Sequence, residues 1–202
     1  MIKQILVVCL TLVLAAPVLA QPLDTAYREP NTGITFPAKL GSLQYRGVVD
    51  YAEQGRPDLG ISVRYGLPGN PIRADIYLYD LKKKNLGTGT GSPEVNKIFQ
   101  QAIGDIFSIE KMGAYKDVRK LSEGKTALTT ATGSLPLLHA SFSYRQQPGP
   151  QVLYTGPQVS NLYLSAYKGY FLKIRFSYPD GPKQAEHEKA LEQFLADLGK
   201  IL

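Results

Sequence analysis

Strict alternation of apolar and polar side chains is the feature of this sequence that most limits its fold. In residues 72–79 one set consists of Ile72, Ala74, Ile76 and Leu78, and the other of Arg73, Asp75, Tyr77 and Tyr79. Because successive side chains of a β-strand point to opposite faces, this pattern predicts a strand with one buried face. Residues 138–145 repeat the pattern, with Leu138, Ala140, Phe142 and Tyr144 on one face.

Other segments predict further strands joined by short turns. We expect strands at residues 34–37, 43–51 and 60–65, and a hairpin of residues 115–121 and 125–131 around Ser122-Glu123-Gly124. A second hairpin should join residues 159–167 to residues 170–178 across Lys168-Gly169, with Leu162, Leu164, Leu172, Ile174 and Phe176 facing the core. Strands joined by short turns pair in an antiparallel manner.

Two segments have the apolar spacing of amphipathic helices. Ser92 can cap the free amides of a helix that starts at Pro93, carries apolar residues three and four positions apart, and ends near Gly113. A second helix is expected from about Lys183 to the C-terminus, with its apolar stripe at Leu191, Phe194, Leu195, Leu198 and Ile201. The predicted fold class is therefore α+β, a mainly antiparallel sheet with two amphipathic helices packed on it.

The N-terminus has the pattern of a cleavable secretory signal peptide at residues 1–20. Lys3 precedes an uncharged apolar stretch, Pro17 ends it, and Ala20 supplies the small residue that a signal peptidase accepts before Gln21. An uncleaved anchor would need ~20 consecutive apolar residues, and this stretch is shorter and broken by proline. We therefore predict a periplasmic or secreted protein, cleaved near Ala20-Gln21, with no stable membrane span after cleavage.

Cleavage there leaves 182 residues without a cysteine, since Cys9 is the single cysteine of the chain. A disulfide-rich extracellular scaffold is thereby excluded, and the length suits one packed domain. Residues 21–32 are polar and contain two prolines, so we expect a flexible leader there and a single α+β domain at residues 33–202.

The charge of the mature chain is modestly positive, with 22 Lys and Arg against 17 Asp and Glu. Such a bias favours weak attraction to anionic lipid head groups, polysaccharide or wall polymers. After export we expect no nucleic acid partner.

Two stretches carry a resemblance to known proteins. The first runs from Phe36-Pro37 through Val63-Arg64-Tyr65 to Ile76–Asp80, and the second runs from Asn161 to Arg175 and is followed by Tyr178-Pro179 and the C-terminal helix. From about Thr35 onward the chain is similar to a group of uncharacterised exported proteins of Gram-negative bacteria, which implies an exported location. The order of elements also resembles the Mog1/PsbP-like α/β sandwich, which implies a role in binding or assisting other proteins.

A glycine-rich segment before the first helix is a candidate anion loop, formed by Gly87, Gly89, Gly91 and Ser92. Backbone amides at a helix N-terminus attract phosphate. A P-loop, however, places its Lys-Ser/Thr pair after the last glycine, whereas Ser92-Pro93 follows here. The alternative is a loop that ends in an ordinary helix cap.

Catalytic and metal-binding patterns are absent from the sequence. The two histidines, His139 and His187, are not part of a His-Glu-x-x-His motif, and the mature chain has no cysteine pair, so no metal site or cofactor is predicted. Gly-x-Ser-x-Gly is also absent, although His139 can approach a serine in the folded chain.

The best candidate for a binding surface is a polar face of the predicted sheet. If alternation holds along every strand, one face presents Arg64, Arg73, Tyr77, Tyr79, His139, Arg145, Tyr163, Lys173 and Arg175. Arginine binds carboxylate or phosphate through two N–H groups, and tyrosine offers a rigid contact surface. The alternatives are that these residues form cross-strand pairs on an ordinary exposed sheet, or that a helix covers them.

From these patterns we expect an exported, non-enzymatic binding or accessory protein whose partner is an envelope protein or an anionic envelope molecule. The alternative is an envelope hydrolase that acts on wall or lipid material through residues not identified in the sequence. A deep cleft that contains His139, a serine and carboxylates would favour the hydrolase. A flat or convex basic face would favour the binding protein.

Overall fold

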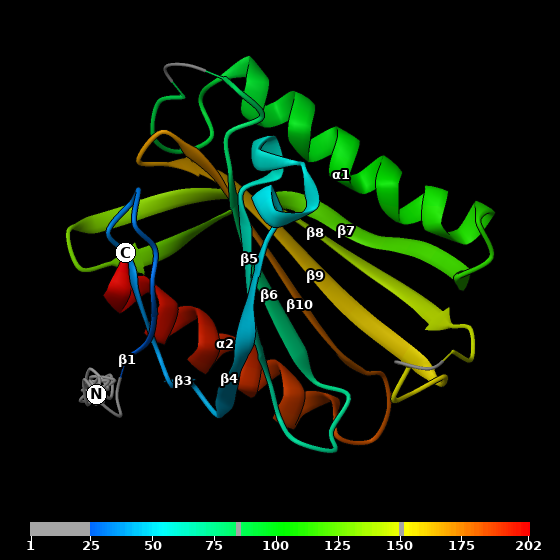
Figure 1. Ribbon diagram of the computed structural model, residues 1–202. Helices are drawn as coiled ribbons and strands as arrows, with labels where there is room; N and C mark the ends of the chain where they lie inside the picture. Colours follow the sequence, from blue (N-terminus) through cyan, green and yellow to red (C-terminus); the bar gives the residue numbers. More distant parts are fainter. Residues whose placement is uncertain (1–24, 84–85, 150–151) are drawn as a thin grey trace, which may run out of the picture.

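The computed structural model describes residues 25–83, 86–149 and 152–202 (Figure 1). The signal peptide predicted at residues 1–20 and the start of the leader lie outside the described residues. The strands are β1 (Thr25–Arg28), β2 (Thr35–Pro37), β3 (Lys39–Leu40), β4 (Leu43–Asp50), β5 (Ile61–Gly66), β6 (Arg73–Tyr79), β7 (Tyr115–Thr130), β8 (Gly133–Gln146), β9 (Pro157–Tyr167) and β10 (Tyr170–Pro179). The helices are α1 (Pro93–Lys111) and α2 (Gln184–Ile201), with two short 3₁₀ helices, η1 (Ala52–Gln54) and η2 (Pro57–Leu59).

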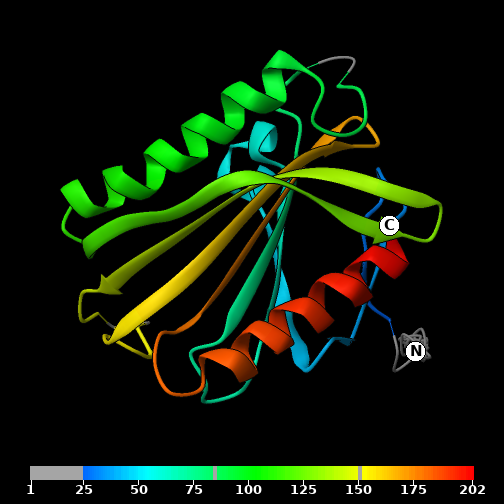
Figure 2. The same cartoon turned by 180° about the vertical axis from the view of Figure 1, so that it is seen from behind.

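Eight strands form one sheet in the order β3-β4-β5-β6-β10-β9-β8-β7, and each neighbouring pair is antiparallel. The sheet is strongly curled, and α1 and α2 pack on its opposite faces (Figures 1 and 2). Strands β1 and β2 form a separate antiparallel pair. The predicted α+β class, with a mainly antiparallel sheet and two packed helices, is confirmed.

Helix α2 bridges the two edges of the curled sheet. At one edge, Gly41 after β3 donates its backbone N–H to Asp197 Oδ2 at 2.9 Å. At the other edge, Ala131 after β7 donates its N–H to Gly199 O at 3.2 Å. On the same helix Phe194 and Leu198 are fully buried. The C-terminal helix therefore closes the main apolar core.

Helix α1 covers the β7–β8–β9 part of the opposite face. The predicted cap is present, since Ser92 Oγ accepts a hydrogen bond from Val95 N at 3.2 Å. Its buried side chains, which include Phe99 and Ile103, form a second core with Phe142 and other apolar residues of β8 and β9. The η1 and η2 segment lies beside α1 on the same side of the sheet (Figure 1). On the face where α1 packs, strands β5, β6 and β10 thus lie beyond the part of the sheet that α1 covers.

The expectation that the central strands share one apolar core is wrong. Leu162 and Leu164 pack beneath α1, whereas Leu172, Ile174 and Phe176 pack on the α2 side. Every residue of β9 after the first is buried, because helices cover both faces of the sheet at this strand. The alternation of apolar and polar residues located these strands correctly. The prediction was wrong because it assumed that only one face of the sheet is covered.

The predicted hairpin around Ser122-Glu123-Gly124 is also wrong. Strand β7 is one continuous strand of 16 residues, and its turn into β8 comes at Ala131-Thr132. Two register shifts in the β7–β8 pairing accommodate the polar stretch. Because β7 is an edge strand with residues 119–127 exposed, it lacks the alternation that marks a half-buried strand.

Part of the expected leader is ordered. Thr25–Arg28 form β1, which pairs with β2. The following turn is held by Glu29, whose carboxylate accepts hydrogen bonds from Asn31 and Thr32. Hydrogen bonds from the turn to the Glu29 side chain therefore help to order this segment, although its sequence has no apolar periodicity.

Candidate functional site

The nine candidate side chains do not share one face. On the α1 side lie Arg64, Arg73, Tyr77, Tyr79, Lys173 and Arg175, and on the α2 side lie His139, Arg145 and Tyr163. The register explains the split. Lys173 lies opposite Leu164, and Leu164 lies opposite Leu138, so the face that holds Lys173 continues through Leu138 and not through His139.

The three residues on the α2 side have structural contacts. His139 stacks on buried Tyr163 with 4.6 Å between ring centroids, and its Nε2 lies 3.1 Å from Asn161 Oδ1. Arg145 is exposed and lies 3.7 Å from the Asp117 carboxylate. Within the described ranges, neither histidine is hydrogen-bonded to a serine, so no histidine-activated serine is assembled there.

The glycine-rich loop uses its polar groups within the fold. Gly89 and Ala166 exchange two backbone hydrogen bonds of 2.8 and 3.0 Å, and the Ser92 hydroxyl caps α1. Gly87 and Gly91 are exposed. Because the Gly89 amide and the Ser92 hydroxyl already have partners, the geometry favours a loop with a helix cap over an anion site.

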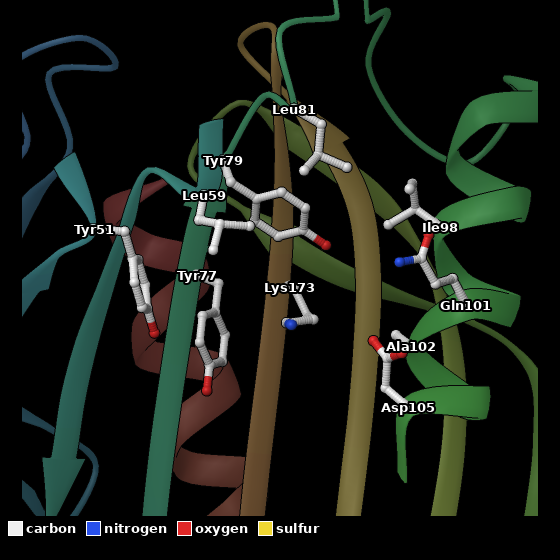
Figure 3. Close-up of a pocket in the computed structure, with 10 residues that line it drawn as sticks. All are labelled: Tyr51, Leu59, Tyr77, Tyr79, Leu81, Ile98, Gln101, Ala102, Asp105 and Lys173. Carbon is white, nitrogen blue, oxygen red and sulfur yellow. The ribbon is translucent and has the colours of Figure 1, made fainter. Parts of the chain in front are cut away.

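A cleft of about 200 Å³ lies on the α1 side of the sheet (Figure 3). One wall is α1, the other is the segment from Tyr51 to Leu59, and the floor is formed by β6 and β10. The lining side chains are Tyr51, Leu59, Tyr77, Tyr79, Leu81, Ile98, Gln101, Ala102, Asp105 and Lys173. Apolar walls with a few polar groups are typical of small-molecule sites.

Lys173 occupies the floor of this cleft. Its Nζ lies 4.2 Å from the ring centroid of Tyr77 and 5.5 Å from that of Tyr79. In the part of the chain that the structure describes, no hydrogen bond or ion pair reaches this ammonium. Burial, reinforced by the nearby Arg175 charge, lowers the pKa of Lys173. Two tyrosine rings therefore provide its main stabilisation, worth about 0.5–1 kcal/mol for the two cation–π contacts together.

Asp105 lies on the α1 wall, across the cleft from Lys173. Its side chain extends from the helix toward the cleft (Figure 3). The two charges are not paired, since no Nζ–carboxylate distance of 4.0 Å or less joins them, although the Asp105 charge acts on Lys173. The cleft thus separates a positive floor from a negative wall.

Arg175 lies further along β10 and is held within the fold. Its Nε donates to Ser160 Oγ at 3.0 Å, and its Nη2 donates to Tyr115 OH at 3.1 Å. Its Cζ lies 5.6 and 5.7 Å from the ring centroids of Tyr115 and Tyr144, which stack on each other. Burial opposes ionisation of Tyr144, whereas the charges of Arg175 and nearby Arg73 favour it, and the net effect of the surroundings is a lowered Tyr144 pKa.

Asp75 is the acidic residue among these cations. It lies opposite Arg64 on β5 and Arg175 on β10, and the Arg64 Nε–Asp75 Oδ1 distance is 3.8 Å. Burial raises the pKa of Asp75, even though Arg73 and Arg64 favour its charged form. One carboxylate therefore faces several cationic groups, and the α1 side of the sheet keeps a positive character.

Sequence reasoning missed both walls of the cleft. Ile98, Ala102 and Asp105 are spaced at i, i+4 and i+7, which puts them on one side of α1, and this spacing is visible in the sequence. Tyr51 carries no such signal, because the turn after β4 places it. The Asp105 wall was thus within reach of sequence analysis, while the Tyr51 wall was not.

No protein-family model matches the chain, and no curated protein matches it. Neither helix of the described ranges is both long and apolar enough to cross a membrane. Among the described residues, no group of three or more His, Cys, Asp and Glu side chains is placed to hold a metal ion.

Proposed function

We propose that the mature chain is an exported, non-enzymatic binding protein that holds a small molecule with an anionic group in the cleft at Lys173. The observation that carries this proposal is the Lys173 ammonium, which lies on the cleft floor between two tyrosine rings without an ion-pair partner among the described residues. Placing a charge in a partly buried site is costly unless it is paired. An anionic ligand group would supply that pairing.

The size and walls of the cleft support a small ligand. Its volume of about 200 Å³ is below the ~300–1,000 Å³ of drug-sized sites. Leu59, Leu81 and Ile98 offer apolar contacts around the charged floor. A carboxylate on a short apolar group therefore fits better than a large phosphorylated or polymeric ligand.

Native mass spectrometry of the protein, expressed with its own N-terminus and released from the periplasm, tests export and binding together. We expect the mass of the chain without residues 1–20, and an added small mass in the wild type that Lys173→Met loses. A chain that retains its N-terminus in the cytoplasm would contradict export.

Titration calorimetry with 4-methylpentanoate at pH 7 tests the site directly. We expect binding to the wild type and to Lys97→Met, which removes the same charge from an exposed position on α1, and loss of binding in Lys173→Met. Equal binding to all three proteins would place the anion elsewhere and overturn the proposal. The alcohol 4-methylpentan-1-ol should bind weakly, because it lacks the charge.

A further inference from the structure

The floor of the cleft indicates a ligand with an anionic group, and the walls indicate what the rest of that ligand is. We propose that the ligand is a small zwitterion with an apolar side chain, an α-amino acid or a close analogue. Its carboxylate would face Lys173 and its ammonium would face Asp105. This inference rests on the proposed function, because it assumes that Lys173 receives an anionic group.

The first argument is the separation of the two charges. Lys173 rises from β10 and Asp105 extends from α1, and the cleft lies between them (Figure 3). Two opposite charges that line one small cavity without pairing leave room for a molecule that carries both signs. A simple carboxylate would pair with Lys173 but would bring its negative charge toward Asp105. An amine alone would meet the opposite problem at Lys173.

The second argument is that the two charged groups differ in burial. Lys173 is half-buried and packed between rings, whereas Asp105 is exposed on α1. The Gln101 side chain also lines the cleft on the α1 wall. Its amide oxygen can accept a hydrogen bond from an ammonium group beside Asp105. The floor therefore suits the carboxylate, and the α1 wall suits the ammonium.

The third argument concerns the remaining wall. Leu59 lies in the wall opposite α1, Leu81 follows β6, and Ile98 lines the cleft from α1. In Figure 3 the ring of Tyr79 is drawn between Leu81 and Lys173, with Leu59 beside it. An aliphatic side chain would be surrounded by apolar atoms there, and its burial would add to affinity roughly in proportion to the area covered. A branched aliphatic amino acid meets all three requirements.

The test compares leucine with two molecules that each lack one of its charged groups: 4-methylpentanoate, which lacks the ammonium, and 3-methylbutylamine, which lacks the carboxylate. Titration calorimetry of the full, purified protein at pH 7 measures each of them. We expect leucine to bind roughly tenfold more tightly than either molecule with one charge, because a second charged hydrogen-bonding group contributes at about this level. 4-Methylpentanoate should bind more tightly than the amine, since only it pairs with Lys173.

Two variants assign the charges. Asp105→Asn should lower leucine affinity roughly tenfold and leave 4-methylpentanoate binding unchanged or tighter. Lys173→Met should abolish binding of both acids. The matched control is Glu94→Gln, which removes the same charge from an exposed position in the first turn of α1 and should change neither affinity. Circular dichroism confirms that each variant is folded.

The outcomes separate this inference from the proposal on which it rests. If 4-methylpentanoate binds the wild type as tightly as leucine, or if Asp105→Asn does not reduce leucine binding, the zwitterion assignment is overturned while the anion site stands. If neither acid binds the wild type, both are overturned.

Discussion

Strand β10 presents two different chemistries on its two faces. On the α2 side, Leu172, Ile174 and Phe176 are fully buried among apolar side chains. On the other side, Lys173 and Arg175 are half-buried beneath aromatic rings. The apolar face stabilises the fold through burial, whereas the cationic face keeps charges where burial opposes them. On an exposed sheet face these charged side chains would be fully in solvent, whereas here they are partly buried. This difference between the two faces of β10 points to the α1 side as the functional side.

The comparison first predicts where stability resides. Phe176 is fully buried and packs on Phe194 of α2 with 5.4 Å between ring centroids. Phe176→Ala should lower the free energy of unfolding by about 3–5 kcal/mol, because it removes a large side chain and leaves a cavity. Urea denaturation followed by circular dichroism measures this change. A loss below about 1 kcal/mol would mean that the α2 face is not the main source of stability.

The next prediction compares one substitution in the two helices. In α2, a Cβ at Gly199 would come within 1.9 Å of Thr129 O, so helix and strand must separate. Gly199→Ala should destabilise the fold by about 1–3 kcal/mol, as overpacking does. In α1, Gly104 is exposed and a Cβ there meets nothing within 4 Å. Gly104→Ala should therefore stabilise by about 0.5–1 kcal/mol through helix propensity.

Thermal unfolding of both glycine variants checks the signs. Opposite shifts of the melting temperature would support close packing at α2 and a free outer surface on α1. Two shifts of the same sign would contradict that difference between the helices.

The smallest expected effect is at Lys173. Replacing a partly buried charge by an apolar side chain is often neutral or stabilising, so Lys173→Met should lie within about 1 kcal/mol of the wild type and on the stabilising side, despite the loss of cation–π contacts worth about 0.5–1 kcal/mol. Arg175→Met should instead destabilise by about 1–3 kcal/mol, because it removes the hydrogen bonds that Arg175 donates to Ser160 and Tyr115. Urea titrations of both variants at pH 7 make the comparison.

The difference in stability between Lys173→Met and the wild type should change with pH in one direction. The pKa of Lys173 in the folded state is below the ordinary value of 10.5, so between these two values the unfolded chain binds more protons. The stability of the wild type should therefore gain from this group as the pH rises toward 10.5. The advantage of Lys173→Met should be largest near neutral pH and shrink as the pH rises. Comparing the two proteins at each pH removes most of the contribution of the tyrosines, and an advantage that grows with pH would contradict the assignment.

Much of the fold was predictable, and the errors have identifiable causes. Residues 72–79 and the Lys168-Gly169 hairpin were predicted correctly because alternation and turn residues act over a few positions. The hairpin at Ser122-Glu123-Gly124 was predicted wrongly because an exposed edge strand needs no apolar face. The predicted nine-residue binding face is divided in two because, across the Lys168-Gly169 turn, Lys173 lies opposite Leu164 and Tyr163 lies opposite Ile174.

The sequence by itself determined which neighbouring residues point together, where α1 begins, and that a chain with a single cysteine, which has no second cysteine to pair with, must hold itself by packing. These properties follow from local sterics and capping, which do not depend on distant residues. Only the tertiary structure decided that α1 and α2 cover opposite faces, that Lys173 and His139 lie on different sides of the sheet, and that Asp105 faces Lys173 across a cleft. Register, curl and helix docking are set by burial summed over the whole chain, so no single segment encodes them.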